Sequence, residues 1–146
     1  MPFVWEAARW VARATGLGVA VDGYLGAVDQ IEQLGRLADG IRTYRDVPKS
    51  IDELQDRVGN GQLGYDDHHI VEEAAARKSG YSEEWIQARQ NLARVPLLKH
   101  YEISGWYSRK NEEFGWLTPR QYLSNKSWEE RYIVGLRAMR KYGVLK

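Results

Sequence analysis

All three histidines of the chain fall within one stretch, as a His68-His69 pair and a single His100, with Asn91 between them. Imidazole side chains hold divalent metal ions and exchange a proton near neutral pH. Consecutive side chains of an extended segment point to opposite faces, so two adjacent histidines can do different work. One can face a metal while the other faces a substrate, and a third can supply a second nitrogen ligand. A metal beside a free imidazole base can activate water against a phosphodiester bond.

The elements expected around the histidines place them close together. Gly59-Asn60-Gly61 predicts a turn, and residues 65–71 read as extended chain. Residues 92–95 form a short apolar strand candidate, and Pro96 is expected at the first position of the following helix. One face of that helix would carry Leu97, His100, Ile103 and Tyr107. His100 would therefore project from a helix toward the strand that carries the pair.

These residues resemble the HNH, or His-Me finger, endonucleases, close to the endonuclease VII-like group with paired histidines. The nine-residue step from Asn91 to His100 is the spacing common in that family. The string Asn91-Leu92-x-x-Val95-Pro96-Leu97 is similar to its strand-to-helix crossing. The resemblance covers roughly residues 62–108 and implies a small ββα-metal core.

The resemblance also implies a role for each residue. His69 would be the general base that deprotonates water, and His68 would be the metal ligand before it. Asn91 would be the loop asparagine that orients His69 or its loop backbone, and His100 would be the helix ligand. The implied cofactor is one divalent metal ion, Mg²⁺, Mn²⁺, Ni²⁺ or Zn²⁺, which polarises the scissile phosphate and stabilises the leaving oxygen.

The chain departs from the family pattern in several places. Many relatives carry another histidine one turn after the helix ligand, where this chain has Ser104. A third ligand would then be water or a carboxylate from the set Asp66, Asp67, Glu72 and Glu102. The chain has no cysteine, so it has neither the family's structural zinc staples nor disulfides.

Charge is distributed unevenly along the chain. Residues 1–88 hold 9 Lys and Arg against 15 Asp and Glu, whereas residues 89–146 hold 12 against 5. A basic part beside a histidine site suits a polyanion such as nucleic acid, although a solvated basic surface is the alternative. Arg94 and Lys99 flank the start of the helix and are the candidates for phosphate contacts. Aromatic residues interleaved with Arg109, Lys110 and Arg120 follow, and such a mixture can form a stacking and phosphate surface for nucleic acid. The alternative, which we favour for Trp106, Trp116 and Trp128, is that these aromatics lie in the core.

An α-helical lead-in is expected before the site. Residues 3–14 predict a short helix, and residues 21–41 predict a long amphipathic one whose apolar stripe packs on the core or on a partner. The boundary is expected within residues 44–50. We therefore expect residues 1–47 to form a lead-in or docking segment and residues 48–146 to form the nuclease-like domain with a C-terminal helical extension.

Capping patterns predict further helices. Ser50 with Glu53 predicts a helix through about Arg57, and Thr118-Pro119-Arg120-Gln121 marks another start. Ser127-Trp128-Glu129-Glu130 opens a last helix that ends at Gly143. Its inward side chains are expected to be Trp128, Tyr132, Leu136 and Met139. The fold class is therefore α+β, predominantly helical, with a small β element at the site.

The sequence favours a metal-dependent HNH-type endonuclease acting on DNA. The alternatives are a non-catalytic nucleic-acid-binding or assembly module that retains the fold, a helical docking protein, and a metal-free RNase. The pattern is also similar to C-terminal toxin modules of bacterial polymorphic toxins. That context implies delivery as part of a larger secreted toxin, action in the bacterial cytoplasm and a cognate immunity protein. No segment is apolar enough to predict a membrane span.

Overall fold

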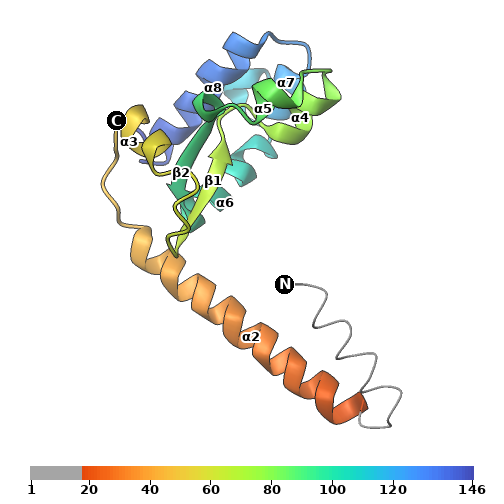
Figure 1. Ribbon diagram of the computed structural model, residues 1–146. Helices are drawn as coiled ribbons and strands as arrows, with labels where there is room; N and C mark the ends of the chain where they lie inside the picture. The colour runs from red at the N-terminus through yellow and green to blue at the C-terminus, as the bar shows by residue number, and fades with distance from the viewer. Residues whose placement is uncertain (1–17) are drawn as a thin grey trace. The chain divides into compact units, whose positions relative to one another are not determined.

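The computed structural model describes residues 18–146, with side chains from residue 26 onward. The helix expected at residues 3–14 lies outside the described residues. The described elements, in chain order, are α2 (Gly18–Thr43), α3 (Ile51–Asp56), β1 (Tyr65–His69), α4 (Glu73–Lys78), α5 (Glu83–Ile86), η1 (Arg89–Asn91), β2 (Leu92–Pro96), α6 (Leu97–Tyr107), η2 (Glu112–Phe114), α7 (Pro119–Leu123) and α8 (Trp128–Lys141). This is an α+β fold that is predominantly helical, as the sequence predicted (Figure 1).

The chain divides into two compact units, Met1–Ala38 and Asp39–Lys146. The long helix expected at residues 21–41 is present as α2, and its last turn belongs to the second unit. In that turn Thr43 is buried, and its hydroxyl donates to the Gly64 carbonyl at 2.7 Å. The boundary expected within residues 44–50 stays a prediction. No helix in the described part of the chain is long and apolar enough to cross a membrane.

The small β element is an antiparallel pair of five-residue strands. β1 and β2 pair from Tyr65 opposite Pro96 to His69 opposite Leu92. Because side chains alternate across a strand, Asp66 and His68 share one face of the pair with Val95 and Ala93. Ala93 and Val95 are fully buried in the main core. α6 contacts both strands, so the face carrying His68 is a packed one (Figure 1).

Pro96 differs by one position from the expectation. It is the last residue of β2 and the N-cap of α6, with φ −55° and ψ 135°, rather than the first residue of the helix. Proline fixes only φ, and the extended ψ keeps this residue in register opposite Tyr65. The helix therefore begins at Leu97, whose N–H donates to the Gly64 carbonyl at 2.9 Å.

Three capping boxes fix three helix starts as the sequence predicted. Ser50, Thr118 and Ser127 each accept a backbone N–H three residues on, and the side chain of that third residue accepts from the cap backbone. Each box satisfies two donors that a helix end would otherwise leave free. The site is thereby framed by helices with well-defined starting points.

The buried face of α8 is broader than expected. Met139 is fully buried, whereas Trp128, Tyr132 and Leu136 are only partly buried. The other buried residues are Arg131, Val134, Gly135 and Ala138. The Arg131 guanidinium donates to the carbonyls of Ala75, Ser124 and Lys126, so this buried cation has hydrogen-bond acceptors. Periodicity of apolar residues alone could not show an arginine on the inner face.

Of the three tryptophans expected in the core, Trp106 lies there at 8 % exposure. Trp128 is partly buried against the smaller cluster of Val71, Ala76 and Ile86. The expectation for Trp116 was wrong, because its side chain is 66 % exposed. Trp116 follows Gly115 in a left-handed turn, with φ 62°, which directs it away from the core.

The contact between α8 and the end of β1 predicts a strong effect of Gly135→Ala. A Cβ at Gly135 would lie 2.1 Å from the Ile70 carbonyl oxygen, which is backbone and cannot give way cheaply. We expect a loss of about 3 kcal/mol or more in the free energy of unfolding, measured by urea denaturation. Gly35→Ala is the matched control, because a Cβ there meets nothing within 4 Å. That helical substitution should be neutral or stabilise by up to about 1 kcal/mol. Equal effects of the two substitutions would contradict this packing.

Candidate active site

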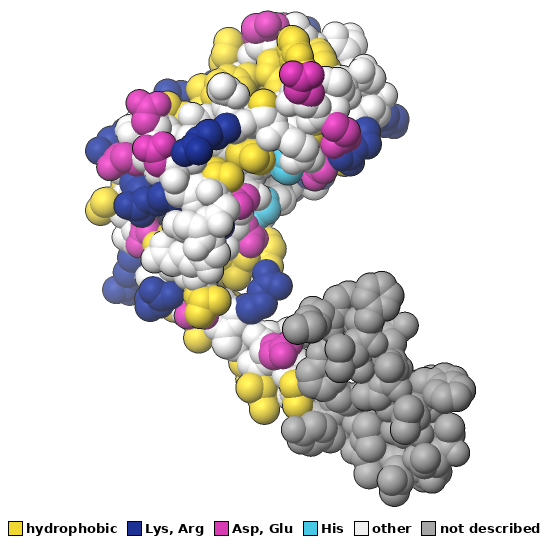
Figure 2. All heavy atoms as spheres, viewed as in Figure 1, with side chains coloured by type: hydrophobic (Ala, Val, Ile, Leu, Met, Phe, Trp, Pro, Cys, Tyr) yellow, Lys and Arg dark blue, Asp and Glu magenta, His cyan; other side chains and the backbone are white. Residues whose placement is uncertain are grey.

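His68 and His100 lie against each other between β1 and α6. Their ring centroids are 5.1 Å apart in an edge-on arrangement. The Nδ1 of His100 lies 3.1 Å from Oδ2 of Asp66, which precedes His68 by two residues on the same strand face. The structure thus brings together two imidazoles and one carboxylate from a strand and a helix, and His68 precedes His100 by 32 residues in sequence. Figure 2 shows histidine side chains reaching the surface beside acidic ones.

His68 is buried without a hydrogen-bond partner for its Nε2 atom among the described residues. Its exposure is 4 %. Burial, and secondarily the charges of His100 and His69, lower the pKa of His68 to about 3. The ring is therefore neutral at physiological pH. An unpartnered buried nitrogen is costly in a folded protein, and such a group calls for an explanation.

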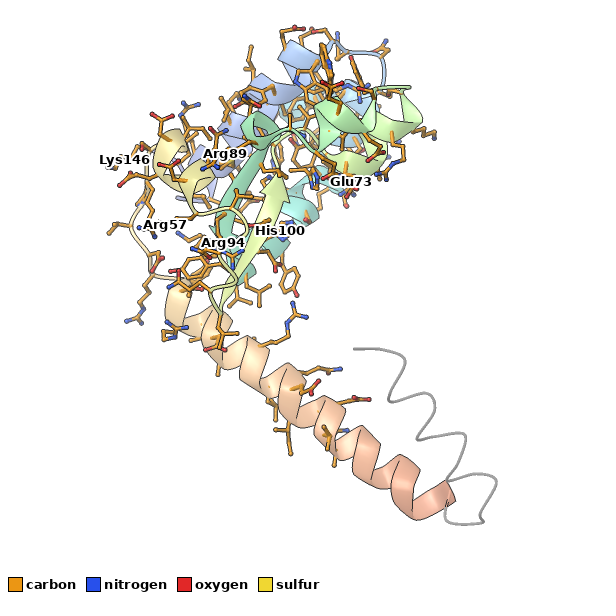
Figure 3. The ribbon with its side chains drawn as sticks, viewed as in Figure 1. Arg57, Glu73, Arg89, Arg94, His100 and Lys146 are labelled. Carbon is orange, nitrogen blue, oxygen red and sulfur yellow. The ribbon has the colours of Figure 1, made fainter. Side chains whose placement is uncertain are left out.

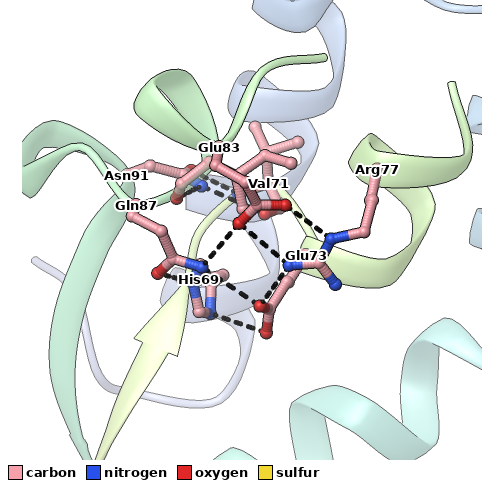
Figure 4. A network of polar contacts seen from close by, with 8 residues as sticks. His69, Val71, Glu73, Arg77, Glu83, Gln87 and Asn91 are labelled. Carbon is pink, nitrogen blue, oxygen red and sulfur yellow. Dashed lines mark hydrogen bonds and ion pairs between the residues drawn. The ribbon is translucent and has the colours of Figure 1, made fainter. Parts of the chain in front are cut away.

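His69 points to the other side of the strand and is oriented by polar side chains (Figure 4). Its Nε2 lies 3.0 Å from Oε1 of Gln87, and its Nδ1 lies 3.9 Å from Glu73. The Gln87 amide nitrogen donates to Glu73 and Glu83, which fixes its oxygen toward the imidazole. An oxygen acceptor at Nε2 requires the proton there, so the neutral ring carries its lone pair on Nδ1.

The Glu73 carboxyl group is ionised at neutral pH. Its hydrogen bond from Arg77, followed by the charge of His69, lowers the pKa of Glu73 below its usual value. The negative charge of Glu73 therefore lies 3.9 Å from Nδ1 of His69. Neither Gln87 nor Glu73 stood out in the sequence, because each comes from a separate short helix segment.

Asn91 fastens the chain where β1 ends. Its exposure is 1 %, and its Oδ1 accepts the Val71 N–H at 2.7 Å. Its Nδ2 donates to the carbonyls of Val71 and Ile86 at 3.2 and 3.0 Å. Ile70 in turn donates to the Asn91 carbonyl at 2.8 Å. Asn91 therefore holds the backbone just after His69 and does not itself reach the imidazole.

An open cleft of about 1100 Å³ contains all three histidines. Its lining comes from β1, α4, α6, α7 and α8. Ser104, one turn after His100, also faces the cleft. The basic residues that line it are Lys78, Arg120 and Arg131, and the acidic ones are Asp67, Glu72 and Glu73. A cleft of this volume has room for an extended ligand beside the histidines.

The structure places Arg94 and Lys99 away from this cleft. Arg94 is 7 % exposed and donates to Asp67 at 2.9 Å and to the Gln62 carbonyl at 2.8 Å (Figure 3). Lys99 is 8 % exposed and donates to the Gly143 carbonyl at 2.8 Å. Both cations satisfy acceptors of their own chain, and their contact with substrate phosphates stays a prediction.

Of the four carboxylates considered as third ligand, only Asp66 lies against a histidine. The other three accept hydrogen bonds from other side chains: Asp67 from Arg94, Glu72 from Arg120 and Glu102 from Tyr44. In the part of the chain that the structure describes, no three His, Asp or Glu side chains are already positioned to coordinate one metal ion. The types of these side chains, rather than their present positions, suit a divalent ion. They are a neutral unpartnered imidazole, a second imidazole and a carboxylate.

Comparisons with family models, curated proteins and solved structures gave no significant match.

The Asn91 clamp predicts a large loss of stability on substitution. Asn91→Ala leaves one buried N–H and two carbonyls without their partner, at about 1–3 kcal/mol for each unsatisfied group. We expect the free energy of unfolding to fall by about 3 kcal/mol or more, measured by chemical denaturation. Asn125→Ala is the matched control because Asn125 is exposed. A loss below about 1 kcal/mol, or one equal to that of the control, would contradict the clamp.

The buried neutral His68 predicts a pH dependence of stability. The folded pKa of about 3 lies below the ordinary value of 6.5, so the unfolded chain binds more protons between these values. The free energy of unfolding therefore receives the full contribution of this pKa difference above about pH 6.5, and it loses that contribution as the pH falls toward 3. Between pH 6.5 and 4.5 the metal-free wild type should lose about 2–3 kcal/mol more than His68→Leu. Parallel stability curves for the two proteins in EDTA would show that His68 titrates normally.

Proposed function

We propose that the chain is a metal-dependent endonuclease of the HNH type that hydrolyses phosphodiester bonds of DNA. The observation that carries this proposal is the unpartnered Nε2 of His68, buried beside His100 and Asp66 in the wall of a cleft that also contains His69. A strand ending in two histidines, an antiparallel partner strand and a helix carrying the third match the ββα order that the resemblance implies.

His68 and His100 would hold the ion, with Asp66 as the nearest carboxylate for a third position. A divalent ion held there supplies Lewis-acid stabilisation of charge on the phosphate and on the leaving oxygen. Ser104 faces the same cleft but is too weak a donor to replace a histidine. Water would complete the coordination.

His69 acts as the general base. It accepts a proton from the attacking water at Nδ1, the nitrogen that its contact with Gln87 leaves unprotonated. Glu73, 3.9 Å away, stabilises the imidazolium that results. Gln87 keeps the ring in the required tautomer, and Asn91 positions the backbone that carries it. His69 is the catalytic residue of this set, and Gln87 and Asn91 are positioning residues.

The biological setting rests on the resemblance to bacterial toxin modules. In that setting the domain is the effector of a larger secreted polypeptide, acts in the cytoplasm of a bacterial target cell and is neutralised by an immunity protein. Binding of DNA would use the exposed basic side chains of the cleft, Lys78 and Arg120.

A second candidate function is a non-catalytic module that docks on another protein. The exposed apolar stripe of α2 favours it, with Ile31, Leu34 and Ile41 each at least 60 % exposed. Spacings of three and seven residues put these side chains on one helix face. In that function the histidines would be dispensable, and substitutions in the stripe would abolish the activity.

Cleavage of supercoiled plasmid separates the two functions. We expect nicking by the purified chain with at least one of Mg²⁺, Mn²⁺, Ni²⁺ or Zn²⁺, and none in EDTA. His69→Ala should lower the rate by about 10²–10⁴-fold, the contribution of a positioned general base. Asn125→Ala, at an exposed residue that does not line the cleft, should cleave like wild type. Absence of nicking with every metal, or equal rates for wild type and His69→Ala, would favour the docking module.

A further inference from the structure

The ion pair between Glu72 and Arg120 lies in the wall of the cleft and has no part in the mechanism above. Glu72 follows β1 and precedes α4, whereas Arg120 belongs to α7. The Arg120 Nε lies 2.8 Å from Oε2 of Glu72, and its Nη2 lies 2.6 Å from Oε1. Both residues line the cleft together with the three histidines. Segments 48 residues apart in sequence thus meet at the site.

The carboxylate occupies only one edge of the guanidinium. Arginine has five N–H donors, one on Nε and two on each terminal nitrogen. Glu72 takes Nε and one donor of Nη2, and the Ser108 hydroxyl takes one donor of Nη1. Among the residues that the structure describes, one donor on each terminal nitrogen is left without an acceptor. The Arg120 side chain is 43 % exposed, so these donors are accessible from solvent, whereas that of Glu72 is 18 % exposed.

This arrangement differs from that of the other two basic residues of the cleft. Arg131 is 4 % exposed and spends its donors on backbone carbonyls and on Ser79. Lys78 lies at the exposed end of α4 and has no fixed partner among the described side chains. Of these three basic residues, only Arg120 is both held in a defined orientation and left with N–H groups that have no acceptor among the described residues. A planar fork of this kind binds a phosphate with two hydrogen bonds, which a lysine cannot do.

We propose that Arg120 is the phosphate-binding group of the cleft, and that Glu72 orients it to receive a backbone phosphodiester of the nucleic acid. Glu72 holds the guanidinium by its Nε edge, so that ordering the side chain costs little when substrate arrives. Arg120 does not touch the imidazoles in the structure, so its role is substrate binding rather than chemistry. This inference rests on the proposed nuclease function and specifies how that function engages its substrate.

Binding of a fluorescein-labelled DNA duplex in EDTA tests the proposal without cleavage. By fluorescence anisotropy, Arg120→Gln should weaken binding by about tenfold. It should also reduce the slope of log K against log salt by about 0.9, the loss of one phosphate contact. Arg120→Lys should keep the salt slope but lose affinity, because the charge remains and the fork does not. Glu72→Gln should keep the wild-type salt slope, because the charge of Arg120 remains, but should weaken binding, because the guanidinium is no longer held in position for the phosphate.

Arg89→Gln is the matched control. Arg89 pairs with Asp56 at 3.0 Å, both side chains are exposed, and neither lines the cleft (Figure 3). This substitution should change neither affinity nor slope by as much as Arg120→Gln. If the Glu72–Arg120 pair only stabilises the fold, Arg120→Gln and Glu72→Gln will lower the melting temperature alike and leave DNA affinity unchanged. That result would overturn the proposal.

Failure of this inference can be told apart from failure of the proposed function. If wild type binds and nicks DNA and Arg120→Gln binds equally well, Arg120 is not the phosphate group and the nuclease function stands. If wild type neither binds the duplex nor nicks plasmid with any metal, both proposals fall together. Should Arg120→Gln not fold, Arg120→Lys decides the question, because unchanged affinity in that variant also overturns the proposal.

Discussion

The register of the two short strands is the constraint on which the rest of the site depends. With His68 opposite Ala93, the face that carries Asp66 and His68 packs against α6 and meets His100. A slip of one residue would turn Asp67 and His69 toward α6 and expose the present inner face. The buried Ala93 and Val95, the Asp67–Arg94 ion pair and the Asn91 clamp all fit only this register. Packing, electrostatics and hydrogen bonding therefore agree on where the histidines lie.

The site combines a buried imidazole without a hydrogen-bond partner, His68, with an imidazole that neighbouring side chains hold in place, His69. His68 carries an imidazole nitrogen with no hydrogen bond in the described residues, which opposes folding. His69 is held by Gln87 and faces Glu73, a setting that suits proton transfer. Departures from complete polar satisfaction are expected at functional sites, where the rest of the fold offsets their cost. The contrast between two neighbouring histidines follows from strand alternation, which gives each a different environment.

Much of the fold was predictable because its signals are local. Ser50, Thr118 and Ser127 marked helix starts through capping boxes, and Gly59-Asn60-Gly61 marked a turn whose two glycines have positive φ. The contact of His68 with His100 followed from the expected strand and helix. Gln87 and Glu73 were not predicted, and Arg120 was noted only as one of several basic residues among aromatic ones. Their roles come from packing between segments distant in sequence. Arg94 and Lys99 show the converse, since being near His100 in sequence did not place them in the cleft.

We expect His68, His100 and Asp66 to hold a divalent metal ion. Titration of the EDTA-treated chain with Co²⁺, followed by its visible absorption, tests this claim without requiring a substrate. The account predicts a single bound ion, weaker binding in His68→Ala and in His100→Ala, and wild-type binding in His69→Ala. Circular dichroism of each variant shows whether the fold is retained. Absence of Co²⁺ binding by the folded wild type, or binding that survives loss of both His68 and His100, would contradict the account.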